Sequence, residues 1–168
     1  PDVSKGRNNV LALMFDMNAL WERFVFVSLR KNLGDQWTVR EQVYQKFWRS
    51  HEIGDVGMKP DIVLENGDHR LVLDTKWKNI GDGKPSPEDL RQLYAYHVYF
   101  DAKKVALVYP GTKEKTTHGL YVKPPRHDGI DKECGVILLA VPESADRRTL
   151  IKEWQHGILA SILAWIGS

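Results

Sequence analysis

The feature that most constrains the fold of this chain is the Asn66-Gly67 pair, which lies between two runs of alternating apolar residues. An Asn-Gly pair in that setting is the strongest short-range signal for a β-hairpin. Within the stretch MKPDIVLENGDHRLVLDTKWK, three charged residues stand where core residues are expected, namely Asp61, Asp74 and Lys76. The sequence therefore predicts a hairpin whose buried part includes two carboxylates and an ammonium group.

The expected register brings these charges together at one end of the hairpin. Side chains alternate between the two faces of a strand, so Asp74 and Lys76 point the same way. A two-residue turn at the Asn-Gly pair places Asp61 opposite Val72, on the same face as Asp74 and one pleat away from it. A four-residue loop, 65–68, gives the same parity, whereas a three-residue loop would break it.

Two neighbouring carboxylates favour a metal site. They repel each other unless a cation neutralises them, so without metal we expect removal of either to leave the fold unchanged or more stable. Oxygen-only ligation favours Mg²⁺ or Mn²⁺, which keep water ligands and hold phosphates. Lys76 beside such an ion would orient or deprotonate a water, or stabilise charge on a phosphate, as phosphodiester hydrolysis requires. The alternative is a surface hairpin whose Asp61 and Asp74 merely lie at strand ends.

Three helices are predicted outside the hairpin. The first spans about residues 10–34 and is capped near Asp16 or Asn18, with Gly34 as its stop signal. Its expected apolar stripe consists of Leu20, Phe24 and Val27. The second follows Ser86 as N-cap and Pro87 at the first helical position. The third is amphipathic and runs from about 146 to 165.

Three further strands are expected at 104–110, 118–124 and 134–142, each closed by a proline. Segment 37–49 is interpreted as extended at its start, and a helix is the open alternative. The order of helix, hairpin, helix, strands and helix predicts a mixed β-sheet flanked by α-helices, in the α/β class. The chain of 168 residues is long enough for one domain with its own core, so we expect a single domain over 1–168.

Composition excludes several classes of protein. With 24 basic and 22 acidic residues, the chain is nearly neutral and does not have the overall charge typical of nucleic-acid binders, although a local basic groove is compatible with it. The lone cysteine, Cys134, excludes a disulfide framework, a four-cysteine zinc site and a cysteine-held iron–sulfur cluster, and it suits a reducing cytoplasm. No membrane-length apolar run or signal-peptide pattern occurs, and the start at Pro1 predicts a fragment of a longer protein.

The hairpin motif resembles a known nuclease signature. Pro60-Asp61, a short strand–turn–strand and Asp74-Thr75-Lys76 resemble the PD-(D/E)xK signature of restriction-endonuclease-like nucleases. This resemblance implies the restriction-endonuclease-like fold and a metal-dependent nuclease. It also implies that the main-chain carbonyl of Thr75 is a further metal ligand.

Two outlying features extend the resemblance. Gln92 and Tyr96 match the Q-x-x-x-Y helix that follows the catalytic lysine in RecB-like members of this superfamily. Their spacing of four puts them on one helical face, where they would hold the active-site strand or a DNA phosphate; alternatively Gln92 faces solvent and Tyr96 lies in the core. Glu22 corresponds to the glutamate on the first core helix that commonly completes the metal shell, and the alternative is a solvated helical glutamate.

The combination of FDMNALWERFV, the hairpin and DLRQLYAYHVYF is similar to McrC-type nuclease subunits of McrBC modification-dependent restriction systems, over about residues 10–110. The resemblance implies an Mg²⁺-dependent endonuclease that cuts methylated double-stranded DNA once a GTP-hydrolysing AAA+ partner, McrB, has bound modified sites and translocated. Family members carry an N-terminal region that contacts this partner, and we expect the chain to lack it. Consistent with a separate motor, the sequence has no G-x-x-x-x-G-K-(S/T) loop.

The predicted site is therefore assigned residue by residue. Asp61 and Asp74 would hold Mg²⁺ or Mn²⁺ with Glu22 and Thr75, and Lys76 would activate the water. Gln92, Tyr96 and Lys78 would support the site or contact phosphate. A double-strand break needs two active sites or two successive cuts, which a dimer would supply. The rival functions are another RecB-like repair nuclease and a non-catalytic module that stimulates a nucleotide-hydrolysing partner.

Two stretches of basic residues each have a structural and a functional interpretation. Lys78 and Lys84, in the loop after the lysine strand, either contact DNA phosphates or are simply solvated. The second stretch contains Lys113, Lys115, Lys123 and Arg126, and a solvated face is its simpler interpretation.

Overall fold

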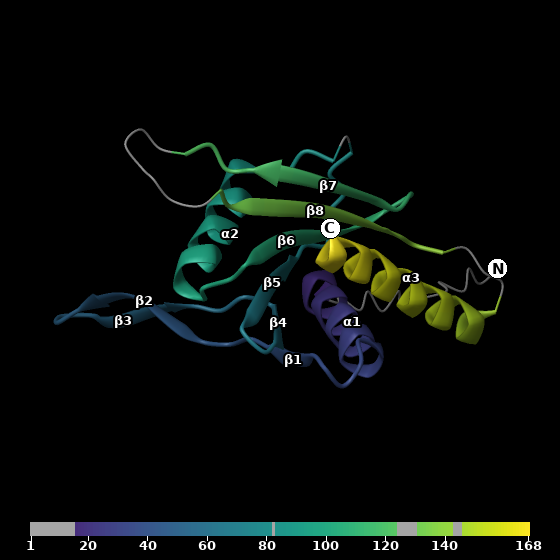
Figure 1. Ribbon diagram of the computed structural model, residues 1–168, viewed down its shortest axis with the longest axis horizontal. Helices are drawn as coiled ribbons and strands as arrows, with labels where there is room; N and C mark the ends of the chain where they lie inside the picture. Colours follow the sequence, from purple (N-terminus) through teal and green to yellow (C-terminus); the bar gives the residue numbers. More distant parts are fainter. Residues whose placement is uncertain (1–15, 82, 124–130, 143–145) are drawn as a thin grey trace, which may run out of the picture.

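The computed structural model describes residues 16–81, 83–123, 131–142 and 146–168 (Figure 1). Its elements are α1 (Met17–Asn32), β1 (Thr38–Glu41), β2 (Gln45–Ser50), β3 (Gly54–Met58), β4 (Ile62–Asn66), β5 (His69–Thr75), α2 (Pro87–Tyr99), β6 (Lys104–Gly111), β7 (Lys115–Leu120), β8 (Glu133–Ala140) and α3 (Arg147–Gly167). Among the described helices, none combines the length and apolar character needed to cross a bilayer.

Six strands form one mixed sheet in the order β1-β4-β5-β6-β8-β7. The β4–β5 hairpin is antiparallel, β5, β6 and β8 are parallel, and β7 returns antiparallel at one edge. Helices α1 and α3 cover one face of the sheet and α2 covers the other (Figure 1). The predicted mixed sheet flanked by helices is confirmed.

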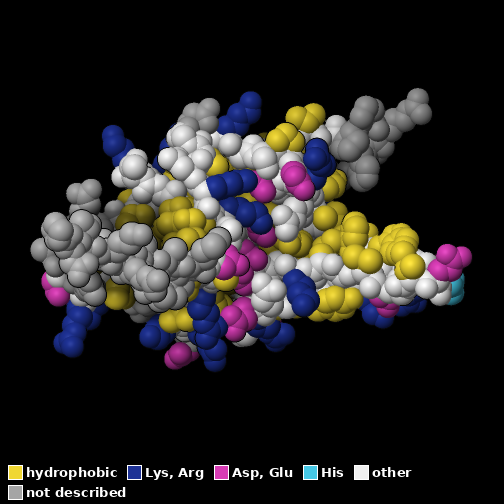
Figure 2. All heavy atoms as spheres, turned by 180° about the vertical axis from the view of Figure 1, so that it is seen from behind, with side chains coloured by type: hydrophobic (Ala, Val, Ile, Leu, Met, Phe, Trp, Pro, Cys, Tyr) yellow, Lys and Arg dark blue, Asp and Glu magenta, His cyan; other side chains and the backbone are white. Residues whose placement is uncertain are grey.

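Strands β2 and β3 form a separate two-stranded sheet that extends from the body as an arm (Figure 1). The helix alternative for segment 37–49 is therefore wrong, because this segment supplies β1 and most of β2. Apolar side chains lie exposed along the arm (Figure 2). They are Tyr44, Phe47, Trp48, Ile53 and Val56.

The predicted apolar stripe of α1 is confirmed only in part: Phe24 and Val27 are half-buried and pack against the core, but Leu20 does not. The helix begins after Asp16, whose side chain accepts hydrogen bonds from the backbone of its first turn, as predicted. Its face against the sheet carries Trp21, Val25 and Leu29, whereas Leu20 is 48% exposed. Phe24 packs on the ring of Trp154 in α3, with centroids 4.6 Å apart. Apolar residues of α1 recur at helical spacing on two neighbouring faces of the helix. The spacing alone therefore did not identify which face packs against the sheet.

The hairpin register differs from the predicted one by two residues. Ile62 pairs with Leu73 and Asn66 with His69, so Gly67-Asp68 forms the turn. Gly67 has a φ of +56°, which suits a glycine at the first central position of a hairpin turn. The shift by two keeps the parity of the side chains, and it places the two aspartates opposite each other.

The remaining elements follow the prediction with shifted ends. Ser86 caps α2, accepting a hydrogen bond from the N–H of Asp89 over 3.1 Å, and Asp146 caps α3. Strand β7 starts three residues earlier than expected and ends at Leu120. The proline expected to close it, at position 124, lies outside the described residues.

Candidate active site

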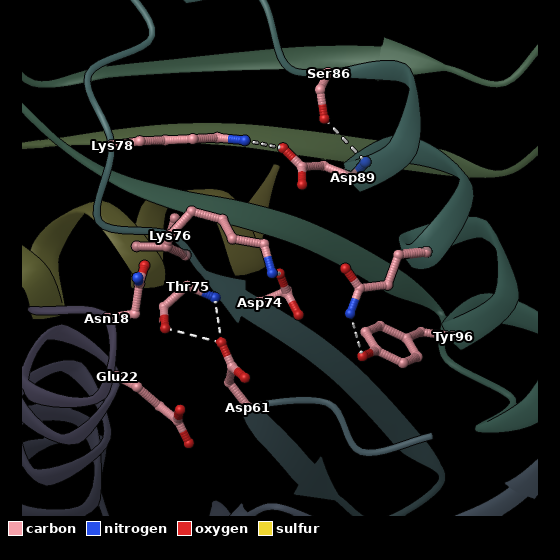
Figure 3. A network of polar contacts seen from close by, with 12 residues as sticks. Asn18, Glu22, Asp61, Asp74, Thr75, Lys76, Lys78, Ser86, Asp89 and Tyr96 are labelled. Atoms are coloured by element: carbon pink, nitrogen blue, oxygen red, sulfur yellow. Dashed lines mark hydrogen bonds and ion pairs between the residues drawn. The ribbon is translucent and has the colours of Figure 1, made fainter. Parts of the chain in front are cut away.

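The two aspartates meet where β4 begins and β5 ends (Figure 3). Asp61 directly precedes β4, and its Oδ2 accepts hydrogen bonds from the Thr75 N–H over 2.6 Å and from the Thr75 hydroxyl over 2.8 Å. Asp74 is 1% exposed, because β5 lies in the sheet between β4 and β6. The fold thus fixes one carboxylate by hydrogen bonds and buries the other beside it.

Asp74 is held mainly by Lys76. Its Oδ2 lies 2.5 Å from the Lys76 Nζ, but in the described part of the chain this buried oxygen has no partner with hydrogen-bond geometry. Burial, followed by the charge of Asp61, raises the pKa of Asp74 to about 6, although Lys76 opposes this. Burial alone would lower the pKa of Lys76, yet the Asp74 carboxylate raises it above its usual value. Without another cation, the ammonium group therefore neutralises the acids.

Glu22 reaches toward the same place from α1 (Figure 3). Its Oε1 accepts a hydrogen bond from Gln42 Nε2 over 2.6 Å. Burial raises the pKa of Glu22; the Gln42 hydrogen bond opposes this, and the charge of Asp61 adds to it. Glu22 is thus within electrostatic reach of Asp61, and its role as a metal ligand stays a prediction.

Gln42 was not predicted from the sequence. Its N–H donates to the Asp61 carbonyl over 3.1 Å, so one residue contacts both Asp61 and Glu22. Its φ of +53° is unusual for a residue other than glycine. A glutamine in a short loop has no sequence signature for such a position.

Gln92 and Tyr96 lie on α2 at the other side of the site. Gln92 Nε2 donates to the Tyr96 hydroxyl over 2.8 Å, and this hydroxyl donates to the Lys59 carbonyl over 3.3 Å. Tyr96 is buried and Gln92 is exposed. The pair therefore fixes the segment just before Asp61, whereas a contact with DNA phosphate stays a prediction.

Lys78 points to Asp89 of α2 and not to the acids of the hairpin (Figure 3). Its Nζ lies 2.6 Å from Asp89 Oδ2, which also accepts a hydrogen bond from the Tyr109 hydroxyl over 3.1 Å. Asp89 and Asn18 are further residues that the sequence did not single out for the site. Asn18 Oδ1 accepts a hydrogen bond from the Trp77 N–H over 3.0 Å and so connects α1 to the segment directly after β5.

The residues present fit a hard divalent cation with few protein ligands. Within the described ranges, no three His, Cys, Asp or Glu side chains are grouped closely enough to hold a metal by themselves. Mg²⁺ is commonly bound by one or two carboxylates, together with waters and substrate phosphates. Asp61 and the buried Oδ2 of Asp74 match that donor set. The carbonyl of Thr75 as a ligand stays a prediction.

The family model described as "McrBC 5-methylcytosine restriction system component" matches residues 1–110. The chain belongs to this McrBC family. None of the curated proteins compared with the chain matches it. The resemblance to McrC inferred from the sequence is confirmed, and the chain is McrC-like.

Solved structures support the fold. The chain is similar to one from a complex of Thermococcus gammatolerans, described as McrB AAA+ hexamers with bound McrC, with a TM-score of 0.58 and 20% identity. The match covers 85% of this chain and 33% of that chain, so this chain spans about a third of its length. At this identity the likeness shows the fold alone.

Two weaker matches add nothing to the fold assignment, because their TM-scores are low. The protein of unknown function AF1548 has a TM-score of 0.38 and 16% identity, over 54% of this chain and 47% of that one. SSO0001 has a TM-score of 0.43 and 15% identity, over 86% of this chain and 59% of that one.

Replacing Asp61 by Ala is expected to lower the free energy of unfolding of the metal-free protein by about 1 to 3 kcal/mol. The reason is that two donors of Thr75, which is 4% exposed, lose their acceptor. For Asp61 this replaces the expectation that its removal leaves the fold at least as stable, whereas for Asp74 that expectation stays a prediction. Urea unfolding followed by tryptophan fluorescence measures the effect. Asp61→Asn, which keeps an acceptor oxygen, is the control and is expected to lose less; an Asp61→Ala variant as stable as the wild type would contradict the structural role.

Proposed function

We propose that this chain is the DNA-cutting subunit of a modification-dependent restriction system. It is a metal-dependent endonuclease that hydrolyses phosphodiester bonds in methylated DNA together with a GTP-hydrolysing AAA+ partner. One observation carries the proposal: Asp61 and Asp74 face each other, and among the described residues the buried Oδ2 of Asp74 is met only by the Lys76 ammonium group, without hydrogen-bond geometry. Membership of the McrBC family supports the restriction-system part.

The roles of the side chains follow from their contacts. Asp61 and Asp74 hold Mg²⁺ or Mn²⁺, which when bound polarises the phosphate and lowers the pKa of a water. Thr75 fixes the Asp61 carboxylate through two hydrogen bonds. The Lys76 ammonium, half-buried beside Asp74, donates to the attacking water or to a phosphate oxygen as negative charge develops there. The water oxygen bonds to phosphorus and releases a proton to solvent, while the bond from phosphorus to one ester oxygen breaks and this departing oxygen takes up a proton from solvent to become a hydroxyl.

The partner is proposed on two grounds. The sequence has no phosphate-binding loop of the G-x-x-x-x-G-K-(S/T) kind, so nucleotide hydrolysis is assigned outside these 168 residues. The similar chain from Thermococcus gammatolerans comes from a complex of McrC with McrB AAA+ hexamers. Because the described residues of one chain form one candidate site, a double-strand break takes two chains or two successive cuts. A cytoplasmic location stays a prediction.

Cleavage of plasmid DNA tests this function. The chain is mixed with its McrB-like partner, GTP, Mg²⁺ and plasmid with or without 5-methylcytosine. We expect linear product only from methylated plasmid in the complete mixture, and none after chelation of the metal. Cleavage that persists in chelator would contradict a metal-dependent nuclease. Stimulation of GTP hydrolysis by the chain without any cleavage would instead favour a non-catalytic docking module.

A further inference from the structure

A hollow of about 670 Å³ opens beside the candidate active site, at the carboxyl ends of the parallel strands. One wall is the segment 77–81 after β5, and the other consists of residues 110–113 and Lys115, from the end of β6 to the start of β7. Leu138 and Val141 at the end of β8 complete the lining. Because Trp77 directly follows Lys76, the hollow begins one residue from the lysine of the site. Ligands of open α/β sheets bind at such strand ends.

The charge of the hollow is opposite to that of the site next to it. Among the described residues, its lining includes Lys78, Lys113 and Lys115 and no acidic side chain. Lys78 is paired with Asp89, whereas Lys113 and Lys115 are exposed and make no ion pair within the described part of the chain. In the same stretch Lys123 pairs with Asp131 over 2.9 Å, and Arg126 lies outside the described residues. Two ammonium groups at the hollow are therefore available to an anion.

The rest of the lining is largely apolar. It includes Trp77, Ile80, Pro110, Leu138 and Val141. The ring of Trp77 packs against that of Trp21, with centroids 5.7 Å apart, which fixes its orientation. An apolar or aromatic surface with lysines beside it suits a nucleotide, whose base stacks or packs while its phosphate meets the ammonium groups. A volume of about 670 Å³ also lies in the usual range for small-molecule sites.

We infer that this hollow binds one nucleotide of the DNA strand next to the phosphate that is cut. Its phosphate contacts Lys113 and Lys115, and its base packs against the apolar lining around Ile80. The inference rests on the proposed function: the wall that starts at Trp77 follows Lys76 directly in the chain, so the strand cut at the site is the proposed occupant. A free nucleotide has the same chemistry, and the experiments below distinguish the two sources.

Binding of fluorescent oligo-dT in chelator, measured by anisotropy at several salt concentrations, tests the phosphate contacts. The variant Lys113→Ala/Lys115→Ala is compared with Lys31→Ala/Lys152→Ala, which removes two exposed lysines from α1 and α3. Loss of two phosphate contacts makes the plot of log affinity against log salt shallower by about 1.4 for a single strand. The control variant is expected to keep the wild-type slope. Equal slopes in the two double variants would overturn the proposal.

The base contact is tested with Ile80→Ala and an abasic strand of the same length. The variant is expected to bind oligo-dT several-fold more weakly than the wild type does, and to bind the abasic strand equally well. An equal loss of affinity for oligo-dT and for the abasic strand would show that no base binds in the hollow. Thymidine monophosphate, tested as competitor, is expected to bind at least about a hundredfold more weakly than oligo-dT, since it makes only one of the contacts of the strand. Tighter binding of the mononucleotide would make this a free-nucleotide site.

Mn²⁺ binding without DNA separates this inference from the proposed function. Lys113→Ala/Lys115→Ala is expected to bind Mn²⁺ like the wild type. If that variant loses DNA affinity while the wild type binds no metal, the result supports nucleotide binding in the hollow and contradicts the nuclease proposal. If metal binds normally and both double variants bind DNA alike, only the inference that the hollow binds a nucleotide is contradicted.

Discussion

The Lys76→Ala variant is expected to bind Mn²⁺ at least as tightly as the wild type and to cut DNA at least about a hundredfold more slowly. Without divalent cation the ammonium group lies 2.5 Å from Asp74 Oδ2 and competes with a metal for that oxygen. Its removal leaves two carboxylates with more net negative charge, which favours a divalent cation. The same change removes the group that donates to the water or the phosphate. Metal affinity and cleavage rate therefore change in opposite directions.

Calorimetry for Mn²⁺ and initial cleavage rates with the motor partner measure the two effects. Lys103→Ala is the matched control, because this exposed lysine directly precedes β6, at the opposite end of the strands from the site. It is expected to leave both quantities unchanged. Thermal unfolding of each variant shows whether the fold is intact. A folded Lys76→Ala protein that cuts at the wild-type rate would exclude a catalytic lysine at this position.

In the absence of divalent cations, the free energy of unfolding is expected to fall by about 2 to 3 kcal/mol as the pH rises from about 4 to about 6. The folded protein holds the proton of Asp74 up to its raised pKa of about 6, whereas the unfolded chain releases it near 3.8. In this window the folded state binds more protons, so stability is highest at the acidic end. Burial and then Asp61 cause the raised pKa, against the attraction of Lys76.

Chemical unfolding of the wild type and of Asp74→Asn between pH 4 and 8 isolates this contribution. The comparison is needed because Glu22 also has a raised pKa, from burial, while that of Asp89 is lowered by Lys78 and Ser86 despite its burial. We expect the variant to lose most of the decline and to be the more stable protein at pH 7. Parallel plots of unfolding free energy against pH for the two proteins would show that the charge of Asp74 does not destabilise the metal-free fold.

The parts of the fold that sequence predicts well are those with local signals. The Asn-Gly pair identifies the hairpin, and a serine followed by a proline identifies the start of α2. The register needs more than the pair, because Gly67 takes the first turn position and shifts the pairing by two residues. The sequence did not predict the arm of β2 and β3. Its apolar residues are exposed, so they do not follow the alternation of buried and exposed residues by which strands are recognised.

The same distinction holds for the site. Asp74 and Lys76 are two residues apart on one strand, so their shared face follows from strand geometry. Gln42 contacts Asp61 and Glu22 only because the end of β1 turns toward them with an unusual φ. Asp89 likewise meets Lys78 through the packing of α2 against the sheet. Such contacts depend on tertiary structure and leave no spacing in the sequence.

Calorimetric titration of Mn²⁺ into the wild type and Asp74→Ala tests most directly whether the hairpin acids form a metal site. A short DNA oligonucleotide is included in a parallel series, because its phosphates supply part of the metal shell. We predict binding by the wild type, at least with DNA present, and its loss in Asp74→Ala. Binding of equal affinity in the variant, or no binding by the wild type even with DNA, would contradict a metal-dependent nuclease site at Asp61 and Asp74.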